Sequence, residues 1–253
     1  MPDESTEPLR PEDVCAFFSA PEAVAHYTDA TVQIGLWRSE EKVFRQVFAP
    51  DDTLLDLGCG AGRIALGLQE LGYRNVIGVD FSQAMVKAAR HQARLLEVPV
   101  PFRREDARAL SFADGLFDGV IFGFNGLMQI PGAADRLQAA REVGRVLRPG
   151  GHFVFTTHDR DEPRLRKFLE TQHQWWSSGE PPPQLHEFGD NLFDSGNGMV
   201  FMHLPDRKEV LHLLEEAGLT HLFDAMRAEI ANEPNDVRAF SDSCRFWIAQ
   251  KNA

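Results

Sequence analysis

The sequence contains few cysteines and no long apolar run. Its three cysteines among 253 residues, Cys15, Cys59 and Cys244, are too few and too scattered for a disulfide framework or a Cys-x-x-Cys metal site. We therefore expect no metal and a reducing, cytoplasmic location. The longest apolar stretch, at 117–130, is interrupted by an aspartate and an asparagine, so it falls short of the roughly 18 apolar residues that a membrane helix needs.

Basic residues are scarce relative to acidic ones. Lys and Arg number 26 against 38 Asp and Glu, which gives a formal net charge of -12. A field of this sign repels phosphate backbones, so we expect no nucleic-acid partner. We therefore interpret the arginines at 103–104 and along 136–148 as solvent-exposed surface charges and not as a nucleic-acid site. Residues 1–10 are acidic and polar, unlike a signal peptide, and we expect neither export nor a membrane partner.

Strand patterns alternate with helix patterns along most of the chain. This alternation indicates a mostly parallel sheet that is covered by helices on both faces. Ser82 is a good cap for the helix that follows it, and the R-P-G-G at 148–151 is expected to stop a helix before the next strand. Strands are predicted at 53–57, 75–80, 99–106, 117–124, 152–158, 219–227 and 244–250, and helices at 63–72, 82–96, 134–147, 162–176 and 207–217.

The same patterns divide the chain into four parts. Residues 1–48 form a helical segment that we interpret as a lid, and 49–158 form a ligand-binding core. Residues 159–206 form an insert of a helix and a hairpin at 187–204, which turns at a Gly-Asn-Gly, and 207–253 complete the sheet.

The sharpest motif is D-L-G-C-G-A-G at 56–62, between a predicted strand and a predicted helix. Gly58 and Gly60 let the backbone turn tightly and let a ligand approach, and the helix start offers free N–H groups. Asp80 ends the second strand 22 residues after Gly58, where a carboxylate can accept hydrogen bonds from ribose hydroxyls. Although a purely structural turn is the alternative, the pair of features favours a nucleotide-like ligand.

The glycine spacing separates two such ligands. A dinucleotide loop requires G-x-G-x-x-G, but Arg63 occupies the third glycine position and the glycine is at 62 instead. With Asp56 at the strand end, the motif resembles motif I of the class I S-adenosylmethionine (SAM) methyltransferases. The resemblance covers roughly 50–160 and implies a Rossmann-like, doubly wound α/β fold with a seven-stranded, mostly parallel sheet. It also implies SAM as cofactor and S-adenosylhomocysteine (SAH) as product.

The resemblance further implies roles for individual residues. Asp80 with Phe81 matches the strand end that holds the ribose, and Asp106-Ala107 matches the pair beside the adenine. The segments at 111–121 and 141–155 match the end of the family's core. The candidate cofactor-binding residues are Tyr27, Trp37, Asp56, Gly58, Cys59, Gly60, Asp80, Phe81, Met85, Asp106, Ala107 and Phe124.

The segment F-N-G-L-M at 124–128 differs from the N-P-P-Y loop with which related enzymes hold a planar amino group. We therefore predict a small-molecule methyl acceptor, whose accepting atom stays open. A base is needed only if the acceptor arrives protonated. His158, at the end of the fifth strand, is the candidate to orient or deprotonate it, although a satisfied structural histidine is the alternative. His186, Glu187 and His203, which bracket the hairpin, are weaker candidates.

Several alternatives stay open. Tyr27 and Trp37 either close over SAM or pack helices onto the core. The many aromatic and Met side chains of 159–206 either cover an apolar acceptor or form a satellite core or a dimer surface, so the chain is a monomer or a homodimer. A non-catalytic SAM-binding protein and a nicotinamide-dependent oxidoreductase are the other functions. Retention of Asp80 and Asp106 argues against the first, and the Arg63 position against the second.

Overall fold

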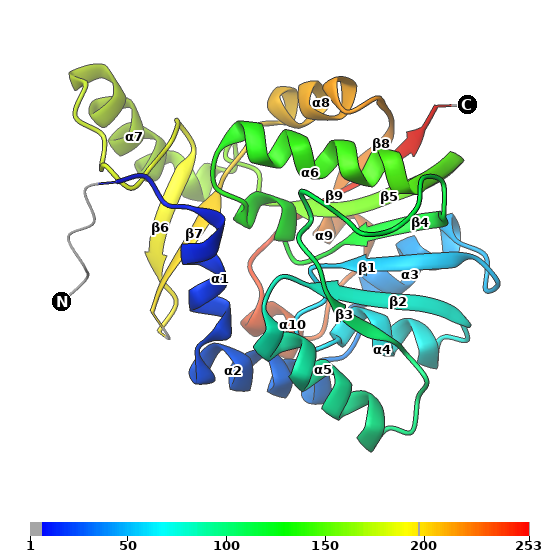
Figure 1. The fold of residues 1–253 in the computed structure, drawn as a ribbon. Coiled ribbons are helices and arrows are strands. Elements are labelled where there is room, and N and C mark those ends of the chain that lie inside the picture. The colour runs from blue at the N-terminus through cyan, green and yellow to red at the C-terminus, as the bar shows by residue number, and fades with distance from the viewer. Residues whose placement is uncertain (1–6, 197, 253) are drawn as a thin grey trace.

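The centre of the computed structural model, which describes residues 7–196 and 198–252, is a seven-stranded sheet flanked by helices (Figure 1). Its strand order is β3-β2-β1-β4-β5-β9-β8, and only β9 runs antiparallel to its neighbours. The order reverses between β1 and β4, where open α/β sheets bind ligands beyond the strands' carboxyl ends. The strands are β1 (Thr53–Leu57), β2 (Asn75–Asp80), β3 (Phe102–Arg104), β4 (Phe117–Phe122), β5 (Leu147–Thr157), β8 (Leu219–Met226) and β9 (Arg245–Lys251).

Helices cover both faces of this sheet, and a separate hairpin lies beyond its edge. The helices are α1 (Pro11–Ser19), α2 (Pro21–Gln33), α3 (Arg38–Val47), α4 (Arg63–Glu70), α5 (Gln83–Leu95), α6 (Ala133–Val146), α7 (Arg166–Ser178), α8 (Arg207–Glu216), α9 (Arg227–Ile230) and α10 (Asn235–Phe240), with 3₁₀ turns η1 (Gly126–Gln129) and η2 (Pro163–Leu165). The hairpin pairs β6 (Asp190–Asp194) with β7 (Met199–His203).

Two buried clusters hold the layers together. Alternate residues of a strand point to opposite faces, so Leu54 packs with α3, α4 and α5, whereas Leu55 packs with α6 and α8. Val120 and Ile121 divide in the same way on β4. This continuous burial on both faces explains why the strands read as apolar runs, and it confirms the predicted doubly wound, seven-stranded fold.

The structure corrects two predicted strands. The third strand is β3, only 102–104, because Pro99 and Pro101 lack the N–H groups that a longer ladder needs. The fifth strand begins at Leu147, so the R-P-G-G segment lies within β5 and does not separate it from α6. A register shift between Phe117 and Gly119 on the neighbouring β4 accommodates those four residues.

The structure also adds two short helices that the sequence patterns did not predict. Both α9 and α10 lie in the 227–244 connection between β8 and β9. The hairpin within 187–204 is confirmed, although Asn197 of its turn lies outside the described residues.

Segments from both termini and the insert gather around one edge of the sheet. Figure 1 places α1, α2, the β6–β7 hairpin and α10 on the side of the sheet toward which the parallel strands run. The hairpin contacts α1, and α1 contacts both α2 and α5. Within the described chain, every helix is too short or too polar to cross a lipid bilayer.

Candidate active site

The loop after β1 leaves open space at the carboxyl edge of the sheet. Gly58 and Gly60 have φ angles of 67° and 54°, in the left-handed region that favours glycine. A Cβ on Gly58 would lie 2.6 Å from the ring of Phe122, so the loop is packed tightly against β4 there. No atom lies within 4 Å of a Cβ placed on Gly60, so this glycine borders a cradle that a side chain would begin to fill.

Asp80 fixes this loop to the end of β2. Its Oδ2 accepts a hydrogen bond from the Gly60 N–H at 2.9 Å, and its Oδ1 accepts one from the Ser82 N–H at 2.8 Å. Burial raises the pKa of Asp80, and the two N–H groups oppose that shift. The carboxylate therefore lines the cradle with no cation among its hydrogen-bond partners in the described chain.

Asp56 lies deeper beneath the same loop. Its side chain is buried, and its Oδ2 accepts a hydrogen bond from the Ala65 N–H at 3.0 Å. Burial raises the pKa of Asp56 to about 8, against the opposing effects of that N–H and of the charge on Arg63. A cationic ligand in the adjoining pocket would favour its ionised form.

Asp106 meets an arginine that the sequence did not single out. The Arg108 guanidinium donates to both carboxylate oxygens of Asp106 and also binds Asp135 at 2.7 Å and Glu12, from α1, at 3.3 Å. Although burial alone would raise the pKa of Asp106, these bonds from Arg108 hold it below its ordinary value. Arg108 thus joins the loop after β3 to α1 and α6 at the rim of the site.

Four aromatic side chains form one wall, which we call the aromatic wall: Phe18, Tyr27, Phe124 and Phe240. Tyr27 lies 5.8 Å from Phe18 and 5.9 Å from Phe124 between ring centroids, and Phe124 lies 5.2 Å from Phe240. Burial raises the pKa of Tyr27 to about 12, so its hydroxyl stays protonated. The wall draws on α1, α2, the loop after β4 and α10, which are far apart in the sequence.

The loop after β4 holds Phe124 in an unusual backbone conformation. Phe124 and Asn125 have φ angles of 49° and 60°, a region that non-glycine residues seldom occupy. The Asn125 N–H donates to the Thr156 hydroxyl at 2.9 Å, which anchors the loop to β5. Such strain concentrates at binding sites and here turns the Phe124 ring toward the aromatic wall.

One pocket joins the glycine loop, the carboxylates and the aromatic wall. Its lining is largely apolar, with a few polar groups at the ends of strands, as in sites for small molecules. It brings together these predicted cofactor-binding residues: Tyr27, Asp56, Gly58, Cys59, Gly60, Asp80, Phe81, Met85, Asp106, Ala107 and Phe124.

Known proteins with this core identify it. Residues 54–151 match the family described as a methyltransferase domain. The demethylmenaquinone methyltransferase of Lactiplantibacillus plantarum is 40% identical over 118 residues, which cover 45% of this chain and 48% of that protein. Residues 54–151 of this chain are a methyltransferase domain.

Solved structures share the fold over most of the chain. A SAM-dependent methyltransferase of Methanosarcina mazei has a TM-score of 0.67 at 24% identity and covers 86% of this chain and 99% of its own. The [4+2]-cyclase SpnF has a TM-score of 0.68 at 18% identity and covers 98% of both chains. The matched sequence spans about half the length of the curated relatives, so the activity of the whole chain is a separate question.

The residues around the methyltransferase loop fit the family's cofactor. The cradle at Gly60 and the carboxyl groups of Asp56 and Asp80, whose hydrogen-bond partners among the described residues are backbone N–H groups, suit a ligand that carries hydroxyl groups and positive charge. The Cys59 side chain lies within the loop, where burial raises its thiol pKa well above the ordinary value, so it stays a neutral thiol.

Trp37 does not line the pocket. Its ring is buried between the guanidinium groups of Arg63 and Arg227, 4.8 Å and 4.9 Å from its centroid. Arg63 in turn forms a buried, bidentate ion pair with Glu40 at 2.6 and 2.7 Å. The structure thus supports the packing alternative for Trp37, and a direct contact with the cofactor is not supported.

His158 also lies outside the pocket lining. Its Nδ1 bonds the Ser243 carbonyl at 2.9 Å and its Nε2 lies 3.3 Å from the Asn125 amide nitrogen. Burial lowers the pKa of His158, so the ring is neutral, donating from Nδ1 and accepting at Nε2. The two nitrogens thus join the end of β5 to the loop after β4 and to the segment before β9, which suits the structural alternative.

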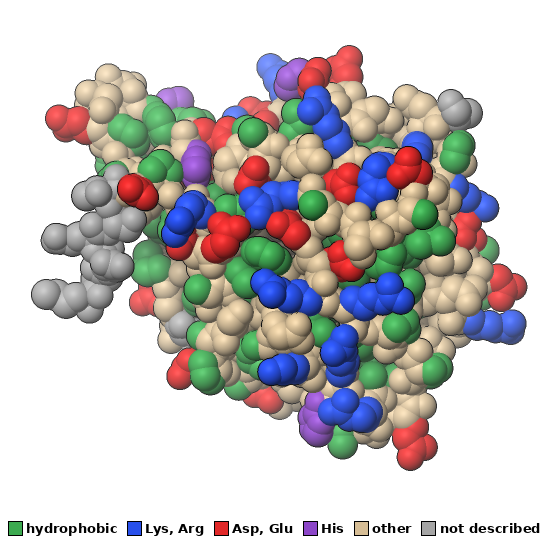
Figure 2. Space-filling view, in the orientation of Figure 1, with side chains coloured by type: hydrophobic (Ala, Val, Ile, Leu, Met, Phe, Trp, Pro, Cys, Tyr) green, Lys and Arg blue, Asp and Glu red, His purple; other side chains and the backbone are tan. Residues whose placement is uncertain are grey.

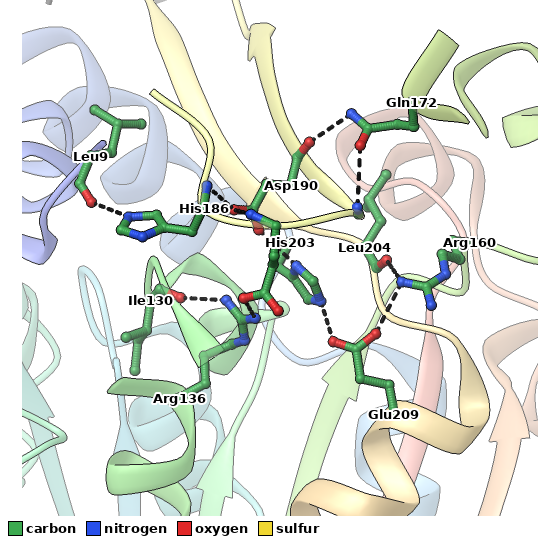
Figure 3. Close-up of polar contacts among 12 residues, drawn as sticks. Leu9, Ile130, Arg136, Arg160, Gln172, His186, Asp190, His203, Leu204 and Glu209 are labelled. Carbon is green, nitrogen blue, oxygen red and sulfur yellow. Dashed lines mark hydrogen bonds and ion pairs between the residues drawn. The ribbon is translucent and has the colours of Figure 1, made fainter. Parts of the chain in front are cut away.

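Two of the weaker candidates, Glu187 and His203, belong to a polar cluster with a buried centre, which we call the His203 network: Arg136, Glu187, Asp190, His203 and Glu209. His203 Nδ1 binds Asp190 at 2.7 Å, its Nε2 binds Glu209, and Arg136 binds Glu187 (Figure 3). Although atoms of Glu187, Asp190 and His203 lie within 4.8 Å of one another, as in metal sites, these bonds engage them. The network joins the hairpin to α6 and α8.

The insert lies beside the pocket rather than in its lining. Phe201 and Met202 are buried, whereas Phe193 and Met199 are 39% and 48% exposed. Leu9, just before α1, donates its N–H to the Gln184 carbonyl and accepts a bond from His186 at 2.6 Å. The insert therefore reaches the pocket through α1.

Sequence reasoning missed several lining residues. Val14 and Phe18 come from α1, Arg108 from the loop after β3, Gln129 from η1, and Phe240 from α10. Only Arg108 carried a signal, since it follows the Asp106-Ala107 pair directly. The others are brought in by tertiary packing.

Proposed function

We propose that this chain transfers the methyl group of SAM to a small, largely apolar molecule. The proposal rests on one observation: the glycine loop, Asp80 and the aromatic wall line the same pocket. The loop and carboxylates suit the polar cofactor, and the wall suits an apolar acceptor beside it. The proposal includes a cytoplasmic location and an acceptor other than nucleic acid.

The named residues divide the work of binding. Gly58, Gly60, Asp80 and Asp106 would hold the nucleoside part of SAM, and Asp56 would favour its positively charged part. When bound, SAM supplies a methyl group already activated for in-line displacement. The protein then has to exclude water and hold the accepting atom about 3 Å from the methyl carbon, which is a matter of positioning.

The pocket lining favours an acceptor that needs no strong base. Tyr27 and Cys59 keep their protons, since burial raises the pKa of each. Asp106 is engaged by Arg108, and Asp56 and Asp80 accept hydrogen bonds from backbone N–H groups around the glycine loop, where the proposal assigns them to the cofactor. We infer an acceptor that arrives as a ready nucleophile, such as an electron-rich ring carbon or an acidic phenol. The demethylmenaquinone methyltransferase among the relatives makes a quinol-type ring the first acceptor to try.

Calorimetry tests the cofactor half of this proposal. Titrations with SAM, SAH and NAD should show binding of the first two and none of the third. Tighter binding of NAD would support the oxidoreductase alternative instead. Binding of SAM without transfer to any extract component would support a non-catalytic SAM-binding protein.

Transfer of a labelled methyl group tests the acceptor half. Extracts and a panel of quinols and phenols are incubated with labelled SAM, and the product is separated by polarity. We expect label in an apolar small molecule, whereas label in RNA or DNA would refute the acceptor class. With an acceptor in hand, His158→Gln should retain most of the turnover if His158 only holds loops, and should abolish it if His158 is the base.

A further inference from the structure

Arginines of the described chain mostly pair with acids. Ion pairs are formed by Arg45, Arg63, Arg74, Arg108, Arg136, Arg145, Arg160, Arg207 and Arg245, among others. This is expected in a chain with a net charge of -12, because acids outnumber bases around most basic side chains. A group of basic side chains without such partners is therefore a departure from the pattern.

One such group lies on α5 and β3, and we call it the α5–β3 basic surface: Lys87, Arg90, Arg94, Arg103 and Arg104. All five are exposed, and none forms an ion pair with an acid among the described residues. Between residues 81 and 104 the only acid is Glu97. Figure 2 shows Lys and Arg side chains gathered over these two elements.

The basic side chains of α5 lie on one face of the helix. Positions 87, 90, 91 and 94 recur at helical spacing, so they share the solvent-facing stripe of the helix, and position 91 is a histidine. Arg90, Arg94 and Arg103 line a common groove together with one acid, Glu97, and with Pro99 and Phe102. The cations thus face solvent together.

Large apolar side chains lie at the end of the same helix. Leu95 is 64% exposed and Leu96 is 49% exposed, directly after Arg94. Charge on the edge strand β3 also discourages pairing with another sheet, but that role does not explain two exposed leucines at the end of α5. Basic side chains beside exposed leucines are the composition of surfaces that lie on anionic lipid.

The surface begins at the rim of the pocket. The Arg104 guanidinium lies 5.5 Å from the centre of the Phe81 ring and donates to the Phe81 carbonyl at 3.1 Å, and Phe81 lines the pocket. A membrane bound by α5 would therefore lie beside the largely apolar pocket, where an apolar acceptor could pass between them.

We propose that the α5–β3 basic surface docks the protein on the surface of an anionic lipid bilayer. Its cations attract lipid phosphates against the protein's overall negative charge, and Leu95 and Leu96 enter the headgroup layer. Nucleic acid is disfavoured because it makes no use of exposed leucines. The proposal departs from the sequence-based expectation of no membrane partner, and it does not depend on methyl transfer.

Co-sedimentation of the full chain with vesicles tests this docking. We expect binding to equal mixtures of phosphatidylglycerol and phosphatidylcholine, weakening with salt, and little binding to phosphatidylcholine alone. The variant Lys87→Gln/Arg94→Gln/Arg103→Gln removes three cations that hold no backbone carbonyl. It should weaken binding roughly 100-fold, since each basic residue near an anionic surface contributes about fivefold.

A matched control removes three exposed, unpaired cations elsewhere: Arg166→Gln/Lys167→Gln/Lys208→Gln. It changes the net charge equally and should leave binding within about threefold of the wild type, because the lost charges lie far from the docked face. Leu95→Gln should reduce the binding that remains at high salt. SAM affinity of the first variant, measured by calorimetry, should be unchanged, which separates this test from that of the proposed function.

Three results would overturn the docking. The first is no binding to pure phosphatidylglycerol vesicles at low salt. The second is an equal loss in the two triple variants. The third is binding to duplex DNA as tight as to vesicles, lost in the first triple variant while Leu95→Gln has no effect on vesicles, which would indicate a general polyanion surface.

Discussion

The pocket and the His203 network both contain buried carboxyl groups, but the hydrogen-bond partners of these groups differ. Asp56 and Asp80 have backbone N–H groups as hydrogen-bond partners, and burial raises the pKa of each. Asp190 and Glu209 bind His203, and although burial opposes it, the histidine holds their pKa values below the ordinary range. The network is complete in itself, whereas the pocket is arranged to receive positive charge and hydroxyl groups from outside.

Replacement of His203, the cation at the centre of the network, should have the largest effect on the free energy of unfolding. His203→Leu takes from the fully buried Asp190 and from Glu209 the cation that they share, so the free energy of unfolding should fall by about 3–5 kcal/mol. Denaturant unfolding measures this loss. His212→Leu, an exposed histidine on α8, is the matched control and should change it by less than about 0.5 kcal/mol.

The pH dependence of this loss follows from the directions of the shifts. The raised pKa of His203 contributes stability below about pH 6.5 that disappears as pH rises through its folded value. The lowered pKa values of Asp190 and Glu209 contribute stability above about pH 4 that disappears as pH falls. The free energy of unfolding of the wild type should therefore exceed that of His203→Leu most between about pH 4 and about pH 6.5. A difference that stays constant from pH 4 to 9 would contradict a charged network.

Asp80→Asn should lower SAM affinity more than stability, whereas His203→Leu should mainly lower stability. It removes a charged acceptor from the cradle, so SAM affinity should fall by about 1.5–3 kcal/mol. An amide has one accepting oxygen in place of the two that bind the Gly60 and Ser82 N–H groups, so the unfolding free energy should fall by about 1 kcal/mol, much less than in His203→Leu. Calorimetry and denaturant unfolding measure the two quantities. The exposed Asp161→Asn controls for loss of one negative charge, and unchanged SAM affinity in Asp80→Asn would remove Asp80 from the cofactor site.

The contrast between the two regions also shows what the sequence could predict. The glycine loop, Asp56 and Asp80 were found because each lies at the end of a strand whose apolar pattern is local. The pairing of Asp190 with His203 needs the hairpin register, in which these two residues are opposite. A hairpin prediction without a register places the two residues near each other but does not pair them.

The pocket wall was the least predictable part. Phe240 comes from a six-residue helix that is too short for a periodic pattern, and Phe18 comes from α1, which has no fully buried residue in the structure. The sequence left both alternatives open for Trp37, because an aromatic residue upstream of the core has the same sequence signal whether it faces a ligand or two arginines. Tertiary contacts decide these positions, and no local signal substitutes for them.

A further test of this comparison uses pH, because the contribution of Asp56 to the free energy of unfolding depends on its protonation. Its folded pKa of about 8 exceeds its unfolded value, so its contribution to stability is lost as pH rises from about 4 to 8. In free energy of unfolding, Asp56→Asn should match the wild type near pH 4 and exceed it increasingly as pH rises to 9, because the variant buries no charge. Unfolding at pH 4, 7 and 9 measures this difference, and parallel profiles would contradict the raised pKa.

The same residue links stability to the cofactor. Since the positive charge of SAM would favour the ionised form of Asp56, binding at pH 7 should release part of a proton. Titrations in two buffers of different ionisation enthalpy measure that release. Asp56→Asn should abolish the release, and an equal release in the variant would assign the proton to another group.

The smallest expected effect compares the two glycines of the loop. Gly60→Ala places a Cβ in open space, so its cost to stability is the left-handed conformation alone, about 1 kcal/mol. Its SAM affinity should fall more than that, because the methyl group enters the cradle. Gly58→Ala has the same backbone penalty, but its Cβ also meets Phe122 at 2.6 Å, so it should lose more stability than Gly60→Ala. Unfolding and calorimetry on both variants therefore separate packing from binding within one loop. If Gly60→Ala bound SAM as tightly as the wild type, the open space at Gly60 would lie outside the cofactor's path, and the loop would serve only to turn the chain.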